Sequence, residues 1–246
     1  MTHIRGGKIP TEHVPSAVAI CYLSHPICSG TLISKEWVLT ASHCLEDMEK
    51  NDLKILAGAT NLLEATTIPV KDIVRHERYR IERDTQNSMM LTSIEYDIAL
   101  LKLDTTEVGS FKKMSPAMLP PPAVDMEGKV FNVGGWGART AVGSGSGPSI
   151  YYHLIENVPV LSKESCFKTI SSGLFQPFQM FCAGTEVKTT CPGDSGAAAL
   201  YSSFEYPVVI GIVSYGLQDC RGAGVFTKVS QHLGWIFKKT GIRYLN

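Results

Sequence analysis

The sequence predicts an all-β fold, either a barrel or a sandwich, built from many short strands. Short runs of apolar and β-branched residues recur along the chain, and 22 glycines and 13 prolines are spread between them. Only one segment, near the C-terminus, has the apolar spacing of a helix. Apolar residues make up 44% of the 246 residues, which is enough to bury a core and argues against a disordered chain.

The expected strands are short runs bounded by turn residues. In chain order they cover residues 14–23, 30–33, 37–41, 53–57, 67–74, 98–103, 130–133, 155–161, 207–214 and 224–229. Three consecutive prolines at positions 120–122 mark a linker between two β-rich halves. Residues 75–95 mix charges of both signs and are expected to form a solvated loop. Residues 137–149 are rich in Gly and Ser and are expected to form a mobile one.

The one expected helix covers about Ser230 to Lys239. Ser230 has a hydroxyl that suits an N-cap, and Leu233, Ile236 and Phe237 recur at the spacing of one helix face. We therefore expect a helix with one apolar face.

The charge balance gives no reason to expect nucleic acid or an anionic membrane surface as a partner. Lys and Arg number 23, and so do Asp and Glu, so the formal net charge is zero. Binding to nucleic acid or to an anionic membrane surface needs a basic surplus, which is missing here. No apolar run approaches the roughly 20 residues of a membrane-spanning helix.

The seven cysteines favour an extracellular protein. No pair has the C-x-x-C spacing of a zinc or redox site. We interpret six of them as three disulfides and the seventh as a free thiol. A cytosolic protein with reduced, buried cysteines is the alternative. Because no apolar leader precedes Ile4, we expect the sequence to be a processed form.

Three short motifs carry the candidate chemistry. His43 stands beside a cysteine after an apolar run, Asp97 opens an apolar strand, and Ser195 lies in the glycine-rich turn of residues 191–196. Each motif alone has a structural explanation, such as a turn residue or a structural histidine. A serine hydroxyl becomes a good nucleophile when a histidine takes its proton and an acid orients that histidine. The three motifs together, in this order, predict a Ser-His-Asp triad.

These motifs resemble those of the trypsin/chymotrypsin family of serine endopeptidases, over nearly the whole chain. Further stretches that resemble the family lie at residues 4–7, 28–32, 135–137, 180–184, 214–216 and 224–227. The resemblance implies two six-stranded antiparallel β-barrels, with the active site in the cleft between them and a C-terminal helix. It implies a single peptidase domain over residues 1–246. Its parts would be a first barrel at about 4–119, a second at 120–229, and a helix and tail at 230–246.

The resemblance also assigns roles at the active site. His43 would be the general base and then the general acid, and Asp97 would hold its tautomer and stabilise the imidazolium. Ser214 would donate to the buried Asp97. The backbone N–H groups of Gly193 and Ser195 would form the oxyanion hole.

Activation is implied by the same matching. A free amino group at Ile4 would pair with Asp194 in the interior and so form the oxyanion hole, which makes the chain a zymogen until cleavage. With Met1, Thr2 and His3 in place, the Ile4 nitrogen carries no charge, and we expect Asp194 to turn outward. His3 precedes the bond where a basic residue is usual, and Arg5 replaces a small apolar residue.

The disulfides follow from the resemblance too. The implied pairs are Cys28–Cys44, Cys166–Cys182 and Cys191–Cys220. Cys21 has no partner in the family pattern. A buried free thiol is the favoured interpretation, and an intermolecular bridge is the alternative.

Specificity is implied by the residues that match the family's primary pocket. Thr189 would lie at its base, neutral and small, and Gly216 and Gly224 would form its open walls. Such a slot favours a large apolar or aromatic side chain before the scissile bond. Tyr215 and Gly216 would pair with the substrate as an added strand. Lys188 and Asp219 lie near the rim in sequence.

Three departures support a second hypothesis, a catalytically silent homologue that acts as a binding or regulatory protein. Ala197, Ala198 and Ala199 follow the nucleophile turn and would bring methyl groups close to the site. Arg5 alters the amino-terminal motif. The stretch from Tyr79 to Asp97 is several residues longer than in simple digestive members and would narrow the cleft.

The leading hypothesis is a secreted, monomeric serine endopeptidase. Its expected partners are protein or peptide substrates and protein protease inhibitors. No cofactor is expected. No metal is expected either, because the seven histidines form no ligand-spaced set and Glu64 is the only carboxylate between Ala57 and Val70.

Overall fold

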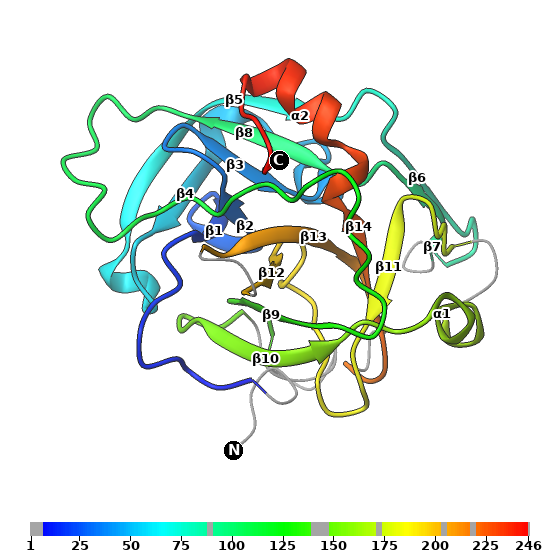
Figure 1. Ribbon diagram of the computed structural model, residues 1–246. Helices are drawn as coiled ribbons and strands as arrows, with labels where there is room; N and C mark the ends of the chain where they lie inside the picture. Colours follow the sequence, from blue (N-terminus) through cyan, green and yellow to red (C-terminus); the bar gives the residue numbers. More distant parts are fainter. Residues whose placement is uncertain are drawn as a thin grey trace.

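The computed structural model describes residues 7–87, 91–138, 148–170, 174–202, 206–216 and 220–245. Two six-stranded antiparallel sheets dominate it, which confirms the all-β prediction (Figure 1). The first sheet closes into a barrel in the order β1-β2-β3-β8-β5-β4. Its strands are β1 (Ala17–Tyr22), β2 (His25–Leu32), β3 (Trp37–Thr40), β4 (Leu53–Ala57), β5 (Thr66–Arg75) and β8 (Ala99–Leu103).

The second sheet has the order β10-β9-β12-β13-β14-β11. Its strands are β9 (Val130–Gly135), β10 (His153–Pro159), β11 (Met180–Ala183), β12 (Ala198–Tyr201), β13 (Val208–Tyr215) and β14 (Gly224–Lys228). A bridge between Val160 and Ala183 brings the two outer strands of this sheet together. The sheet therefore curls toward a second barrel.

β1 shows why the sequence of a barrel strand is a continuous apolar run. Val18 and Ile20 point into the core of the first barrel, whereas Ala19 points to the other face and packs against Trp136 and Tyr152. Successive side chains of a strand alternate between faces. Both faces of β1 are covered here, so both sets of positions are apolar.

β12 and β13 form a wall that the two cores share. Alternate side chains of these strands belong to different cores. Ala198, Leu200, Val209 and Ile212 pack in the first core, and Ala197, Ala199, Val208 and Ile210 pack in the second. We call these two strands the shared wall. The two halves therefore meet through strand side chains rather than through a loose linker.

Residues 75–95 were expected to be a solvated loop, and this prediction is wrong. β6 (Arg80–Arg83) and β7 (Leu91–Glu95) form an antiparallel hairpin there. Arg80 and Glu82 are exposed to solvent, which explains the misleading pattern. Its apolar side chains Ile81 and Ile94 pack against Tyr215 and the region of α1 (Lys163–Thr169). In Figure 1 the hairpin lies at the right, on the same side as β11 and α1.

The helices also differ in part from the sequence prediction. The C-terminal helix α2 begins at Leu233 and ends at Thr240, after a short 3-10 turn at Val229–Gln231. Its N-cap is His232 rather than Ser230, and Phe237 is exposed rather than packed with Leu233 and Ile236. The short helix α1 was not predicted. Ser162 caps it through a bond from the Ser165 N–H.

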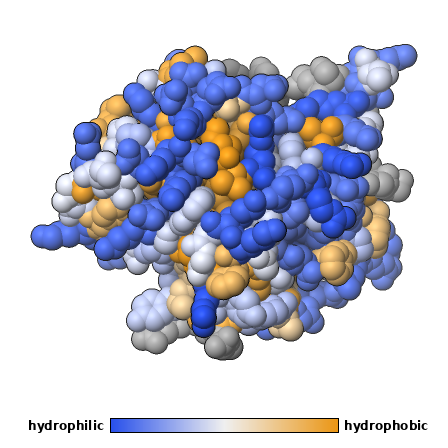
Figure 2. Space-filling model, turned by 90° about the horizontal axis from the view of Figure 1, so that it is seen from above, coloured by the Kyte–Doolittle hydropathy of each residue, from blue (hydrophilic) through white to orange (hydrophobic). Residues whose placement is uncertain are grey.

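The face of the molecule seen from above is mostly hydrophilic, with an apolar strip near its middle and smaller apolar patches around it (Figure 2). Within the described ranges, neither helix is long and apolar enough to cross a membrane. Most of the expected mobile loop at residues 137–149 lies outside the described residues.

Candidate active site

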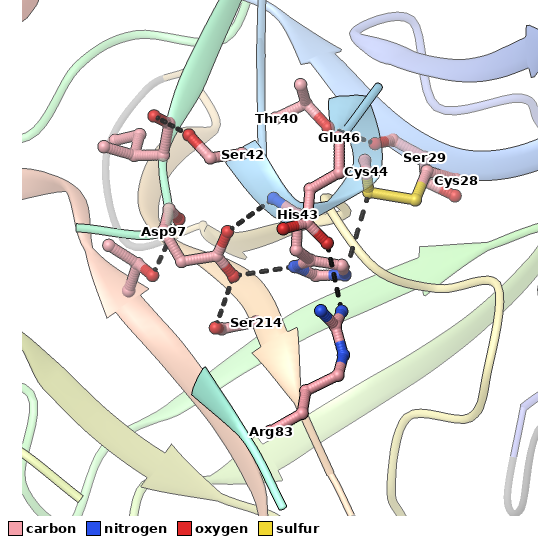
Figure 3. Close-up of polar contacts among 12 residues, drawn as sticks. Cys28, Ser29, Thr40, Ser42, His43, Cys44, Glu46, Arg83, Asp97 and Ser214 are labelled. Carbon is pink, nitrogen blue, oxygen red and sulfur yellow. Dashed lines mark hydrogen bonds and ion pairs between the residues drawn. A yellow bond between two sulfur atoms is a disulfide. The ribbon is translucent and has the colours of Figure 1, made fainter. Parts of the chain in front are cut away.

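His43 and Asp97 come from neighbouring segments of the first barrel. His43 lies on the 3-10 turn η1 (Ser42–Leu45), which follows β3, and Asp97 lies just before β8. The Asp97 carboxylate accepts two bonds from His43. The backbone N–H donates to Oδ1 at 2.9 Å, and imidazole Nδ1 lies 2.8 Å from Oδ2 (Figure 3). This contact fixes the imidazole so that Nε2 is the nitrogen left for other partners.

Asp97 is fully buried, and a third donor helps it keep its charge. Ser214 on β13 donates its hydroxyl to Oδ2 at 2.5 Å, so the second half of the chain also supports the acid. Burial alone raises the pKa of Asp97. The opposing charge of His43 and the three hydrogen bonds outweigh burial and hold this pKa below its ordinary value.

His43 is shifted in the opposite direction. Burial lowers its pKa, but the Asp97 carboxylate and its hydrogen bond raise it further, so the net shift is upward. The side chain of His43 is 19% exposed, which leaves its edge open to the cleft. A histidine with a raised pKa is a stronger base once it is neutral, as a general base requires.

The backbone around Asp97 is held from both barrels. The carbonyl of Asp97 accepts from the Thr227 hydroxyl at 3.0 Å, and the carbonyl of Ile98 accepts from the Ser42 hydroxyl at 2.6 Å. Tyr96 has φ of 50°, a left-handed conformation that is uncommon for an aromatic residue. Its ring stacks on His76 and under the Arg78 guanidinium. These contacts stabilise the unusual turn.

Ser195 lies in a tight turn that leads into β12. Its carbonyl accepts from the Ser29 N–H of β2 at 2.8 Å, which ties the turn to the first barrel. Gly196 has φ of 80°, and a Cβ there would overlap the Thr40 hydroxyl and the Ser29 carbonyl. Only glycine fits this position. Ser195 and His43 line the same cleft.

Two backbone N–H groups in this turn have no acceptor within the described residues. The N–H groups of Asp194, Gly196 and Ala197 all bond to backbone carbonyls. Those of Gly193 and Ser195 bond to no described group. Free N–H groups beside a nucleophile suit the binding of an oxyanion. Gly193 has φ of 94°, and a Cβ there would collide with Gly137.

Asp194 points into the protein rather than outward. Its carboxylate is fully buried and accepts from the N–H groups of Cys191 at 2.9 Å and Gly137 at 3.1 Å. The outward turn expected for the chain with Met1 in place is therefore not what the structure has, because these two donors hold the carboxylate inside. Burial raises the pKa of Asp194 to about 7, since no cation among the described residues offsets it. Ile4 and Arg5 lie outside the described residues.

Of the residues expected at the primary pocket, Gly216 lines the cleft. Thr189 is buried, and its neighbour Thr190 lines the cleft. Gly216 and Gly224 are neighbours next to the Tyr215–Val225 pair of β13 and β14, and a Cβ on Gly216 would lie 3.7 Å from the Gly224 Cα. The Thr190 hydroxyl oxygen would lie 2.8 Å from a Cβ on Gly224. Tyr215 also lines the cleft, as expected.

The cysteines pair as the resemblance implied. The structure joins Cys28 to Cys44, Cys166 to Cys182, and Cys191 to Cys220. Cys21 on β1 is a free thiol with 2% of its surface exposed, and burial raises its pKa to about 11. A thiol so buried and so little ionised is badly placed for a bridge to another chain.

The features that raised doubts about activity differ in their distance from the cleft. Ile81, Arg83, Leu91 and Ile94 of the longer stretch line it, whereas the three alanines do not. Ala197, Ala198 and Ala199 are buried in the shared wall, and none of them lines the cleft. Lys188 reaches away from the site and donates to the carbonyls of Glu156 and Asn157. Asp219 lies outside the described residues.

Sequence reasoning missed an ion pair beside His43. Arg83 of β6 donates to Glu46 at 3.0 Å, and Arg83 lines the cleft with His43 (Figure 3). Both charges act on His43, whose pKa Glu46 raises and Arg83 lowers. Arg83 lies in the mixed-charge stretch of residues 75–95, where the sequence pattern does not distinguish it from neighbours exposed to solvent.

Comparison with known proteins agrees with this geometry. The family model described as Trypsin matches residues 4–236. "Trypsin 5G1" of Aedes aegypti is 28% identical over 97% of this chain and 85% of its own length. "Trypsin" of Phaedon cochleariae is 31% identical over 93% of this chain and 84% of its own length. "Duodenase-1" of Bos taurus is 32% identical over 85% of this chain and 76% of its own length.

Proposed function

The chain belongs to the trypsin family of serine proteases, and from that premise we propose that it is an active, secreted endopeptidase with a triad of Ser195, His43 and Asp97. One observation carries the proposal. A hydrogen-bonded chain runs from Ser214 through Asp97 to His43, and it ends in the cleft that Ser195 lines. Three disulfides support secretion, because such bonds persist in oxidising compartments.

The reaction follows from these positions. Neutral His43 accepts the proton of the Ser195 hydroxyl as its oxygen attacks the peptide carbonyl. Negative charge develops on the carbonyl oxygen, and the free N–H groups of Gly193 and Ser195 stabilise it. His43 then protonates the leaving amine, while Asp97 stabilises the imidazolium. Water, activated by His43 in the same way, releases the acyl group from Ser195.

Activation is the second part of the proposal. A free amino group at Ile4 would supply the cation that the buried Asp194 lacks among the described residues. The pair would fix Gly193, the neighbour of Asp194, with its N–H directed at the substrate. Cleavage before Ile4 would therefore convert an inactive precursor into the enzyme.

We propose a preference for large apolar or aromatic side chains before the scissile bond. The described lining of the cleft contains no carboxylate to attract a basic side chain. Gly216 and Gly224 leave the walls open, and Thr190 adds only a neutral hydroxyl. Peptide anilides with Phe, Tyr or Leu should be cleaved faster than those with Arg or Lys. A strong preference for Arg would overturn this part.

Substrates and inhibitors follow from the same site. We propose protein and peptide substrates, with protein protease inhibitors as further partners of the cleft. We also propose that the chain acts as a monomer and forms a single peptidase domain, with its barrels at about 4–119 and 120–229.

Covalent labelling tests the core of the proposal. A fluorophosphonate or a sulfonyl fluoride should modify Ser195 in a chain that begins at Ile4, at a pH where His43 is neutral. Ser195→Ala should abolish labelling and lower turnover about a million-fold, with little change in thermal stability. Buried serines such as Ser214 serve as internal controls, because they should stay unmodified. Absence of labelling on Ser195 would favour the silent, binding homologue.

A further inference from the structure

Arg83 is a second cationic side chain on the catalytic cleft. Among the described residues that line the cleft, only His43 and Arg83 can carry positive charge. The Arg83 side chain is 42% exposed, and Figure 3 shows it beside the imidazole of His43. It uses one nitrogen, Nη2, for its bond to Glu46. A guanidinium has five N–H donors, so the others stay available to a ligand.

The hairpin that carries Arg83 is fixed at two places. Ile81 and Ile94 pack against Tyr215 and the cluster around α1. Arg83 itself reaches across to Glu46, which follows η1 in the first barrel. Because both ends are held, the guanidinium stays at the His43 side of the cleft rather than moving with the loop.

The direction of a bound peptide decides which substrate residue meets Arg83. A peptide that pairs with Tyr215 and Gly216 as an added strand is extended. Its side chains therefore alternate between two faces. When the side chain before the scissile bond enters the pocket at Gly216 and Gly224, the preceding side chain points the other way. His43 and Arg83 line the same cleft as Tyr215 and Gly216, so we place the preceding side chain beside them.

We propose that Arg83 makes the protein select an acidic side chain two residues before the scissile bond. This inference rests on the proposed function. The substrate carboxylate would pair with the N–H donors of Arg83 that Glu46 leaves free, in a charge-assisted hydrogen bond. A Lys or Arg side chain at this substrate position would meet a like charge and be disfavoured.

The test uses two peptides that differ only in Asp or Asn at that position. With the active form, kcat/KM should be about tenfold higher for the Asp peptide, and the ratio should fall at high salt. The Ser195→Ala chain allows binding to be measured without cleavage. Its Kd should be about tenfold lower for the Asp peptide than for the Asn peptide. Arg83→Gln should bring both ratios to within twofold of one.

Arg80→Gln is the matched control. Arg80 is exposed on the same strand, carries the same charge and does not line the cleft. This variant should keep the tenfold ratios, whereas a general charge effect would reduce them as much as Arg83→Gln does. Arg83→Lys should keep a smaller preference, because the charge remains and the planar fork is lost.

The outcomes separate this inference from the proposed function. If Ser195 is labelled and peptides are cleaved, but the Asp/Asn ratio is near one or survives Arg83→Gln, the role of Arg83 is wrong. If no peptide is cleaved and Ser195 is not labelled, the proposed function fails. In that case the Kd ratio in the Ser195→Ala chain still decides whether Arg83 recognises an acidic side chain.

Discussion

Asp194 should make the chain less stable as pH rises, and a free amino group at Ile4 should remove this loss of stability. Burial raises the pKa of this carboxyl from 3.8 to about 7, and within the described part of the chain the N–H groups of Cys191 and Gly137 are what oppose it. The folded state then holds a proton that the unfolded state releases. Stability from this group is present below pH 4 and is lost as pH rises to about 7.

The size of the effect follows from the two pKa values. A rise of this size corresponds to about 4 kcal/mol of lost unfolding free energy above pH 7. We expect this loss in a chain with residues in front of Ile4. In a chain that begins at Ile4, the ammonium group would stabilise the carboxylate and bring the pKa down, so the loss should largely disappear.

Urea unfolding at pH 4, 5.5, 7 and 8 measures the unfolding free energy of two forms, the extended form with residues in front of Ile4 and the form that begins at Ile4. Both forms should carry Ser195→Ala, which prevents self-digestion. Asp194→Asn in the extended form is the control, because it removes the titrating group while His43 and all others stay. The pH-dependent loss should then shrink by about 4 kcal/mol. Identical pH profiles for the extended form with and without Asp194→Asn would refute the argument.

Three further predictions follow from single positions. Gly196→Ala should lower the unfolding free energy by at least about 3 kcal/mol in chemical denaturation, because its Cβ overlaps Thr40 and Ser29 at φ of 80°. Gly128→Ala has a similar φ of 73° with open space around it and should cost only about 1 kcal/mol; equal losses would contradict the steric argument. Gly216→Val should reduce kcat/KM for Phe substrates about a hundredfold and for Ala substrates much less, because the new side chain would occupy the space beside Thr190 and Gly224. Parallel losses would show that this space is not the pocket. Glu46→Gln should move the acid limb of the kcat/KM profile to lower pH, since the carboxylate raises the pKa of His43. An unmoved or higher limb would show that Glu46 does not act on this base.

The sequence predicted the residues that chemistry constrains most narrowly. Gly196 can be nothing but glycine, and His43 and Asp97 work only as a pair, so these positions stand out in short motifs. The barrel strands were predictable for a different reason, because strands covered on both faces, such as β1, are apolar throughout.

The hairpin β6–β7 and helix α1 were not predicted because tertiary packing, rather than the local sequence pattern, stabilises their secondary structure. Ile81 and Ile94 are the hairpin side chains that pack in the apolar cluster around α1, and these two side chains do not stand out among so many charges. Arg83 owes its importance to a partner 37 residues earlier in the chain.

The shared wall has a consequence for how the molecule unfolds. Each of its two strands contributes side chains to both cores, so loosening either barrel exposes apolar surface of the other. The halves should therefore melt in one cooperative step rather than in two, and neither should persist as a separate fragment after cleavage at the linker prolines. Amide protons of β12 and β13 should exchange with solvent only through global opening, and so be among the slowest in the chain. The turn that holds Ser195 leads directly into this slowest-exchanging region. Ser195 should thus keep its position for as long as the molecule stays folded.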